Sequence, residues 1–214
     1  PNSINYIGID IYVNGELLDL AKADVKEFYR ELDMQNGVLT RKFIAGVCGN
    51  EIEVNVVRFL SIATKELGVI KYEVKSLNFD GEISFVPYLD SNAKNEDSNY
   101  EEDFWVNVSS DAIQNNGSVV ARTKENVFGT EVFTVGAAMN IKCSKKPTSN
   151  TYINKEYYSA NTLVFDIKKY ENISIEKYVA ITTTRDYEEN ELIKKTTDIL
   201  SKEVSKGYEA LLKE

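Results

Sequence analysis

The sequence contains no histidine among its 214 residues. A chain without histidine has no Ser-His-Asp or Cys-His arrangement, no histidine-bound zinc and no imidazole proton shuttle. Any catalysis by this chain would have to use carboxylate, lysine, tyrosine or cysteine side chains.

Cysteine is scarce as well, because the chain has only Cys48 and Cys143 and no Cys-x-x-Cys motif. The sequence alone leaves a disulfide between them open. Each cysteine lies within or beside an apolar strand pattern, where buried free thiols are common. We favour two reduced thiols in a cytoplasmic protein, since disulfides are rare in reducing compartments.

Long hydrophobic runs and basic clusters are also missing. No run of about 18 apolar residues predicts a membrane-spanning helix, so we expect no membrane partner. The formal net charge is −9, the pI is about 4.8, and the longest basic cluster is Lys145-Lys146. Because such a charge repels a phosphate backbone, nucleic acid is not an expected partner.

The sequence does contain many short segments in which apolar and polar residues alternate. The clearest is 70–75, whose strict alternation predicts a strand with one buried face. Turn signals lie between such segments at Asn14-Gly15, Asn36-Gly37, Asp80-Gly81 and Asn116-Gly117. No helical pattern separates the segments, which argues against a parallel sheet. We therefore predict a mainly β fold, with residues 1–184 forming a large antiparallel β-sandwich of roughly 11 to 13 strands.

Two strand-like segments carry more specific predictions. Residues 132–141 (VFTVGAAMNI) are nearly all apolar or small, so we place this strand centrally with both faces covered. We expect Gly136-Ala137-Ala138 to allow close packing of the opposite sheet. In the other segment the alternation slips at Val56-Val57, which indicates either a bulge or a strand that is buried on both faces.

Residues 185–214 have helical rather than strand-like spacing. Asp186 is expected to cap a helix whose first turn holds Glu188 and Glu189. Gly207 is expected to interrupt the helical pattern, which still continues at Glu214. The helix then carries a mostly apolar stripe, which we expect to pack against either the sandwich or a following domain. The stripe comprises Leu192, Ile193, Thr196, Ile199, Leu200 and Val204.

The chain also begins with Pro1 rather than methionine. Together with the unfinished helical pattern, this start leads us to expect a piece of a longer protein. The helix would then begin a linker to the next domain. Without that domain, we expect the tail to fray or the chain to self-associate.

Six segments that span most of the chain carry a family resemblance. They are IYVNGELLDL (11–20), YRELDMQNGVLTRKF (29–43), IEVNVVRFLSIA (52–63), PYLDSNAKNEDSNYEEDFW (87–105), KYVAITTTRD (177–186) and KGYEALLKE (206–214). Read together, they resemble the N-terminal domain of glycoside hydrolase family 65, which includes maltose, trehalose, kojibiose and nigerose phosphorylases. The stretch NEDSNY (95–100) looks most like the maltose phosphorylase branch.

The resemblance implies a galactose-mutarotase-like supersandwich, then a helical linker and an (α/α)6 barrel that holds the active site. It implies an inverting reaction, in which phosphate attacks an α-linked disaccharide and a barrel glutamate acts as general acid. The products would be β-glucose 1-phosphate and glucose. The resemblance assigns no catalytic residue, metal or cofactor to this chain. The implied partners are the barrel of the same chain, the disaccharide, inorganic phosphate and a second subunit in a homodimer.

The most polar stretch, 90–103, lies between two strands and is longer than a hairpin needs, so it is a candidate functional loop. Its calcium-loop spacing is broken by Lys94 and Asn95, so we predict no metal site there. A solvated loop beside a core tryptophan is the alternative to a functional role. The candidates for sugar contact or a subunit interface are Asn95, Glu96, Asp97, Tyr100 and Trp105.

Two other classes of protein remain open at this point. A free-standing carbohydrate-binding module predicts an exposed aromatic platform and sugar affinity. A structural or adhesive sandwich predicts neither. The helical pattern that continues at the C-terminus favours the phosphorylase domain over both.

Overall fold

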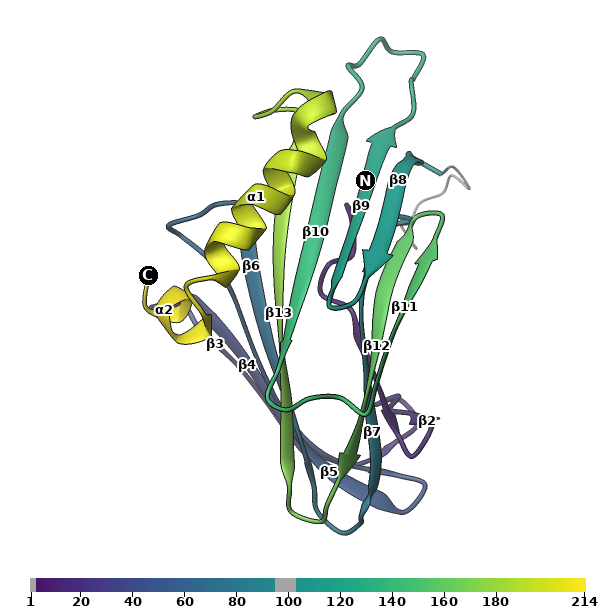
Figure 1. The fold of residues 1–214 in the computed structure, drawn as a ribbon, viewed down its shortest axis with the longest axis vertical. Helices are drawn as coiled ribbons and strands as arrows, with labels where there is room; N and C mark the ends of the chain where they lie inside the picture. Colours follow the sequence, from purple (N-terminus) through teal and green to yellow (C-terminus); the bar gives the residue numbers. More distant parts are fainter. Residues whose placement is uncertain (1–2, 95–102) are drawn as a thin grey trace.

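The computed structural model describes residues 3–94 and 103–214, which form two antiparallel β-sheets packed face to face (Figure 1). The thirteen strands of the described residues are β1 (Ile9–Val13), β2 (Glu16–Leu17), β3 (Asp24–Asp33), β4 (Val38–Val47), β5 (Asn50–Leu60), β6 (Leu67–Ser76), β7 (Gly81–Asp90), β8 (Trp105–Ile113), β9 (Asn116–Thr123), β10 (Thr134–Cys143), β11 (Ser149–Lys155), β12 (Tyr158–Ile167) and β13 (Asn172–Thr183).

The larger sheet has eight strands in the order β3-β4-β5-β6-β13-β10-β9-β8, and the smaller sheet has five in the order β11-β12-β7-β1-β2. Every strand pair among the described residues is antiparallel, as in the pairing of β10 with β13. The prediction of a mainly β, antiparallel sandwich is confirmed. The polar edge strand β11 was not predicted, because SNTYINK lacks apolar alternation.

The core lies between the sheets because the inward-facing positions of both are apolar. In β5, Ile52 and Val54 are fully buried, whereas Glu53 between them is exposed. Phe85 of β7 meets Phe165 of β12 edge to face, with ring centroids 5.9 Å apart. Burial of a side chain of this size contributes about 1.5–3 kcal/mol. A one-residue slip would expose every such side chain, so the alternation excludes that shift of the register.

Two of the four turn predictions are confirmed. Asn14 and Gly15 both have positive φ, 50° and 84°, as a tight hairpin requires. The connection between β3 and β4 ends at Gly37, which also has positive φ (66°). Asn36 there instead donates its backbone and side-chain N–H groups to the Asp33 carboxylate.

The other two turn predictions are wrong. Asn116-Gly117 opens β9, and the turn lies one residue earlier, at Asn115 with φ 63°. Gly81 opens β7, where a Cβ would collide with the Asn14 side chain, so this glycine permits a close approach rather than a turn.

An unpredicted turn joins β4 to β5 at Cys48-Gly49, where both residues have positive φ. Cys48 is therefore exposed rather than buried, while Cys143 is partly buried. Both thiols are free, which confirms that no disulfide joins them.

Strand β10 lies inside the larger sheet between β13 and β9, and both its faces are covered, as predicted. The packing expected of Gly136-Ala137-Ala138 against the opposite sheet holds for Ala137, which lies in the core between the sheets, but is wrong for Gly136. Gly136 faces the helix α1 (Leu192–Val204), where an added Cβ would lie 3.3 Å from the Thr196 hydroxyl and 3.4 Å from Leu192. The glycine thus admits the helix, not the opposite sheet.

The slip at Val56-Val57 is not a bulge. The pairing of β5 with both β4 and β6 continues without a shift through these residues. The other alternative, a strand that is buried on both faces, is correct further along β5. Phe59 points to the outer face and meets Tyr208 of α2 (Tyr208–Lys213), with ring centroids 5.9 Å apart.

The helical tail packs on the outer face of the larger sheet, over β10 and β13 (Figure 1). Leu192 and Leu200 are buried there, while Ile193 and Ile199 are half-buried. The sandwich itself therefore covers the stripe. None of the helices in the described residues is long and apolar enough to cross a lipid bilayer.

The start of the helix differs from the prediction. Asp186 does not cap it; its carboxylate pairs with Lys65 at 2.9 Å instead. A short 3-10 turn, η1 (Glu189–Glu191), precedes α1, and no side chain caps either element. Gly207, with φ 81°, separates α1 from α2 as predicted.

Candidate functional site

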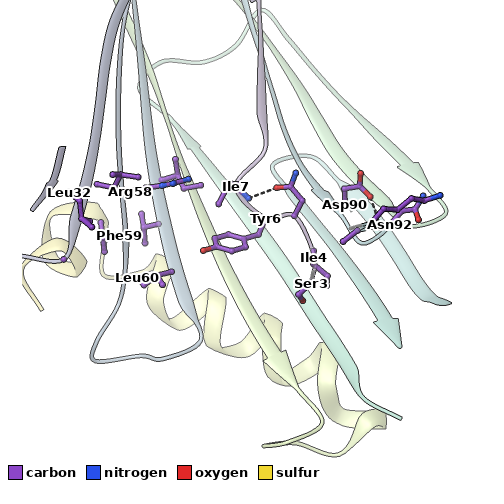
Figure 2. A pocket seen from close by; sticks show the side chains of 17 residues that line it. Ser3, Ile4, Tyr6, Ile7, Leu32, Arg58, Phe59, Leu60, Asp90 and Asn92 are labelled. Carbon is purple, nitrogen blue, oxygen red and sulfur yellow. Dashed lines mark hydrogen bonds between the residues drawn. The ribbon is translucent and has the colours of Figure 1, made fainter. Parts of the chain in front are cut away.

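A broad groove of about 980 Å³ lies at one end of the sandwich (Figure 2). Figure 2 shows Arg58, Phe59 and Leu60 on one side of it and Asp90 and Asn92 on the other, with the N-terminal segment (residues 3–7) between them. The lining residues are Ser3, Ile4, Asn5, Tyr6, Ile7, Leu32, Gly37, Leu39, Arg58, Phe59, Leu60, Val69, Ile70, Asp90, Asn92, Ala93 and Lys94.

Backbone hydrogen bonds hold the N-terminal segment in the groove. The amide of Asn5 donates to the Asp90 carbonyl at 2.7 Å, and the Asp90 amide donates back at 3.1 Å. The Ile7 amide also donates to the Asn5 side chain at 3.2 Å. The segment is therefore a fixed wall continuous with the end of β7.

A buried lysine donates hydrogen bonds to the backbone of the same wall from the core side. Lys177 of β13 is fully buried, and its Nζ donates to the carbonyls of Tyr6, Gly8 and Tyr88 at 2.7, 3.0 and 2.6 Å. Burial lowers the pKa of Lys177 to about 7, because the core does not solvate the ammonium form. The three carbonyl acceptors match the three N–H groups of an ammonium and oppose that shift. Lys177 thus positions the backbone that carries Tyr6.

A smaller recess of about 110 Å³ adjoins the groove, and three arginines line it. Arg30 of β3 stands directly opposite Arg41 of β4, and directly opposite residues point to the same face. Arg41 Nη2 donates to the Tyr72 hydroxyl at 3.1 Å, and its guanidinium lies 5.6 Å from the Phe43 ring centroid. Arg58 of β5 lines both the recess and the groove. The end of the larger sheet's inner face is therefore basic.

The site residues predicted from the sequence have mixed outcomes. Asn95, Glu96, Asp97 and Tyr100 lie outside the described residues. Trp105 is 5% exposed and belongs to the main core, so it offers no exposed platform for a sugar ring. Its bulk and its place at the start of a strand made burial the simpler alternative, which the structure bears out.

The two ends of the candidate loop do lie near the groove. Asn92, Ala93 and Lys94 line it, and Lys94 Nζ pairs with the Asp103 carboxylate at 3.0 Å. A functional role for this loop stays a prediction.

Sequence reasoning missed the arginine recess. A signal for it was present, because Arg41 and Arg58 interrupt the apolar runs of 38–47 and 56–60. The hairpin centred near Gly37 also pairs Arg30 with Arg41 once its register is known. That register depends on turn geometry that the sequence alone did not settle.

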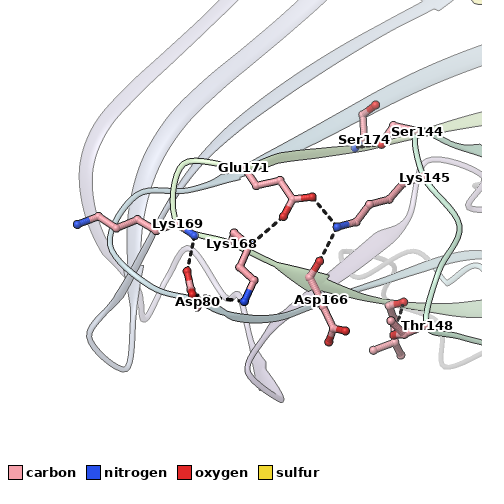
Figure 3. A network of polar contacts seen from close by, with 10 residues as sticks. Asp80, Ser144, Lys145, Thr148, Asp166, Lys168, Lys169, Glu171 and Ser174 are labelled. Carbon is pink, nitrogen blue, oxygen red and sulfur yellow. Dashed lines mark hydrogen bonds and ion pairs between the residues drawn. The ribbon is translucent and has the colours of Figure 1, made fainter.

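A network of polar contacts lies at the end of β7 away from the groove, beside Asp80 (Figure 3). Lys145 Nζ pairs with Glu171 and donates to the Asp166 carbonyl, both at 2.6 Å. The Lys169 amide donates to the Asp80 carboxylate at 2.7 Å. These contacts join three loops and explain the lowered pKa of Glu171, whose carboxylate accepts from Lys145 and from a backbone N–H. We therefore assign these contacts a structural role, in which they hold the three loops together.

No group of three or more Asp, Glu or Cys side chains in residues 3–94 and 103–214 is placed to hold a metal ion. The groove combines one carboxylate, Asp90, with apolar and basic walls. Such a surface can bind an anion or a polar molecule.

Comparison with known proteins identifies the family. The model of the glycosyl hydrolase family 65 N-terminal domain matches residues 1–214. The chain belongs to glycosyl hydrolase family 65. This family 65 domain is 39% identical to maltose phosphorylase of Bacillus subtilis (strain 168) over 208 residues, which is 97% of the chain and 27% of that protein.

Other relatives agree with this assignment. The chain is 27% identical to the α,α-trehalose phosphorylase of Thermoanaerobacter brockii, covering 96% of the chain and 27% of that protein. The solved structure of a kojibiose-phosphorylase-like protein from the human microbiome superposes with a TM-score of 0.82 at 21% identity, over 99% of this chain and 27% of that one. This superposition shows a shared fold. The family 65 domain thus spans about a quarter of the length of these curated relatives.

Proposed function

We propose that this family 65 domain is the non-catalytic N-terminal part of an inverting disaccharide phosphorylase that acts on α-glucosides such as maltose. The whole protein would convert disaccharide and phosphate into β-glucose 1-phosphate and glucose. The observation that carries the proposal is the 39% identity to a maltose phosphorylase across nearly the entire chain. Identity to the trehalose phosphorylase is lower, at 27%, which favours maltose as the first substrate to test.

In this proposal the chemistry resides in a catalytic barrel outside these 214 residues. The absence of histidine limits what the domain can contribute to catalysis. Residues 1–184 would form the sandwich and residues 185–214 would begin the linker to the barrel. The sandwich would pack on the barrel and support a homodimer, in the cytoplasm, where the free thiols Cys48 and Cys143 stay reduced.

A free-standing carbohydrate-binding module is the weaker alternative. It required an exposed aromatic platform, and the tryptophan that was the candidate for it, Trp105, is buried. A module would also bind sugar when separated from any barrel.

The test is glucose release by the whole protein from maltose, trehalose, kojibiose and nigerose, with and without phosphate, beside the same assay on the 214-residue chain. We expect phosphate-dependent release from maltose by the whole protein and none by the chain alone. Release that does not need phosphate would point to a hydrolase and overturn the proposal. Light scattering of the whole protein tests the homodimer.

A further inference from the structure

Three of the five arginines in this chain line one recess on the inner face of the larger sheet. Arg30 and Arg41 are direct cross-strand partners. On β5, Val56 pairs with Arg41, and Arg58 follows two residues later on the same face. With strands about 4.8 Å apart and about 3.3 Å per residue, the three Cα atoms lie within roughly 12 Å of each other. Arginine side chains from these positions can converge on one ligand.

Within the described part of the chain, these three arginines form no ion pair with an acidic side chain, although acidic residues outnumber basic ones in the sequence. The chain has 34 acidic and 25 basic residues. Like charges that face each other across two strands are destabilising. An anion bound between them would reverse the sign of that interaction.

Arg41 provides a second, independent indication. Its Nε is buried and has no hydrogen-bond partner among the described residues. A buried donor left unpaired carries the full cost of its desolvation, and the cost is larger for a charged group. The Tyr72 hydroxyl, which accepts from Arg41, still has its own proton to donate. The recess therefore presents more donors than the described chain uses.

We propose that this recess binds a phosphate group, with the guanidinium groups of Arg30, Arg41 and Arg58 as its principal donors. Arginine forks match phosphate oxygens with two parallel hydrogen bonds each, and a doubly charged anion best balances several guanidinium groups. The volume of about 110 Å³ equals roughly three to four water molecules. It accommodates one small oxyanion but not a polypeptide segment.

The recess opens into the larger groove, with which it shares Ile7, Leu39, Arg58 and Ile70. An organic group carried by the phosphate would thus extend into the groove toward Tyr6. The phosphate is either free inorganic phosphate or the phosphate of a small monoester. This proposal stands on the geometry of the recess and does not depend on the proposed phosphorylase activity.

The experiment measures phosphate bound per chain in the whole protein, by equilibrium dialysis against labelled inorganic phosphate at constant ionic strength. The test variant is the double substitution Arg30→Met with Arg58→Met, which leaves Arg41, with its buried Nε, in place. The matched control is Arg185→Met, since Arg185 is exposed and lies outside the recess. Phosphate bound at an active site elsewhere contributes equally to all three proteins.

We expect the double variant to bind one phosphate fewer per chain, or to bind it at least about a hundredfold more weakly, as loss of two charged donors implies. The control should match the unaltered protein. Arg41→Lys, which keeps the charge but loses the fork, should weaken binding about tenfold or more. Glucose 1-phosphate is then added to the unaltered protein as a competitor for the site that the double variant lacks. Displacement of labelled phosphate from that site would identify a monoester as the preferred ligand, and no displacement would identify inorganic phosphate.

Equal phosphate binding by the unaltered protein and the double variant would overturn the proposal. If that equality came with a change in molar mass by light scattering, the arginines would form a protein contact instead. Failure of the phosphorylase assay, in contrast, would leave the difference in bound phosphate unaffected. The two proposals can therefore fail separately.

Discussion

Replacement of Lys177 by methionine tests how the wall of the groove is held. The side chain is fully buried, and its amine donates to the carbonyls of Tyr6, Gly8 and Tyr88. Methionine has a similar length but donates nothing. The Gly8 carbonyl keeps a second donor, the Tyr88 amide at 3.2 Å. The carbonyls of Tyr6 and Tyr88 lose the lysine donor, at a cost of about 1–3 kcal/mol each.

The cost should depend on pH in a definite direction. Burial lowers the pKa of Lys177 from 10.5 to about 7, so between these values the unfolded chain binds more protons than the folded chain. The free energy of unfolding of the unaltered protein therefore rises with pH in this window, by up to about 1.4 kcal/mol per pH unit. The methionine variant lacks this contribution. The amount by which its free energy of unfolding falls below that of the unaltered protein should therefore grow by about 2 kcal/mol between pH 7.5 and pH 9.5.

Tyr88, a titratable neighbour of Lys177, does not disturb this pH window. Lys177 Nζ lies 5.9 Å from the centre of the Tyr88 ring, and burial raises the pKa of Tyr88 above its ordinary value of 10.0. Groups that the substitution does not affect contribute equally to both proteins and cancel in the difference.

The assay is urea unfolding of the unaltered and Lys177→Met proteins at both pH values, with amide hydrogen exchange of the N-terminal segment. We expect the larger deficit at the higher pH and faster exchange in residues 5–8 of the variant. A deficit that is the same at pH 7.5 and pH 9.5 would refute the reasoning. It would mean that the three carbonyls stabilise the ammonium enough to cancel its desolvation.

Three further predictions concern the core, the helix contact and the thiols. Trp105→Ala should lower the free energy of unfolding by about 3–5 kcal/mol in chemical denaturation, because the ring is buried; no measurable loss would mean that the ring is exposed. Gly136→Val should destabilise the protein by about 1–3 kcal/mol by pushing against Leu192, and Gly136→Ala should cost less; equal stability of all three proteins would show that α1 is not packed there. A thiol reagent at pH 8 should modify Cys48 quickly and Cys143 slowly, since burial raises the pKa of Cys143 to about 11; two equal rates would contradict this assignment.

The sequence by itself determined the class of fold and most of its strands. Alternation in segments such as 70–75 is a local property, because each residue's side depends only on its neighbours along the strand. The central position of β10 followed from the same reasoning, since a segment that is apolar on both faces must be covered on both. The lack of histidine likewise needed no structure to exclude whole classes of active site.

Only the tertiary structure decided which residues meet. Gly136 could be identified as a point of close approach, but whether a sheet or a helix approached depended on how the tail folded back. The burial of Lys177 was not predicted because lysine is rarely fully buried, although its spacing from Ile175 and Val179 places it on the core-facing side of β13. The arginine recess combines three strands whose register is set by turns that the sequence only partly predicted. Spacing along the chain determines the local elements, whereas a site assembled from several strands depends on how those elements pair and pack.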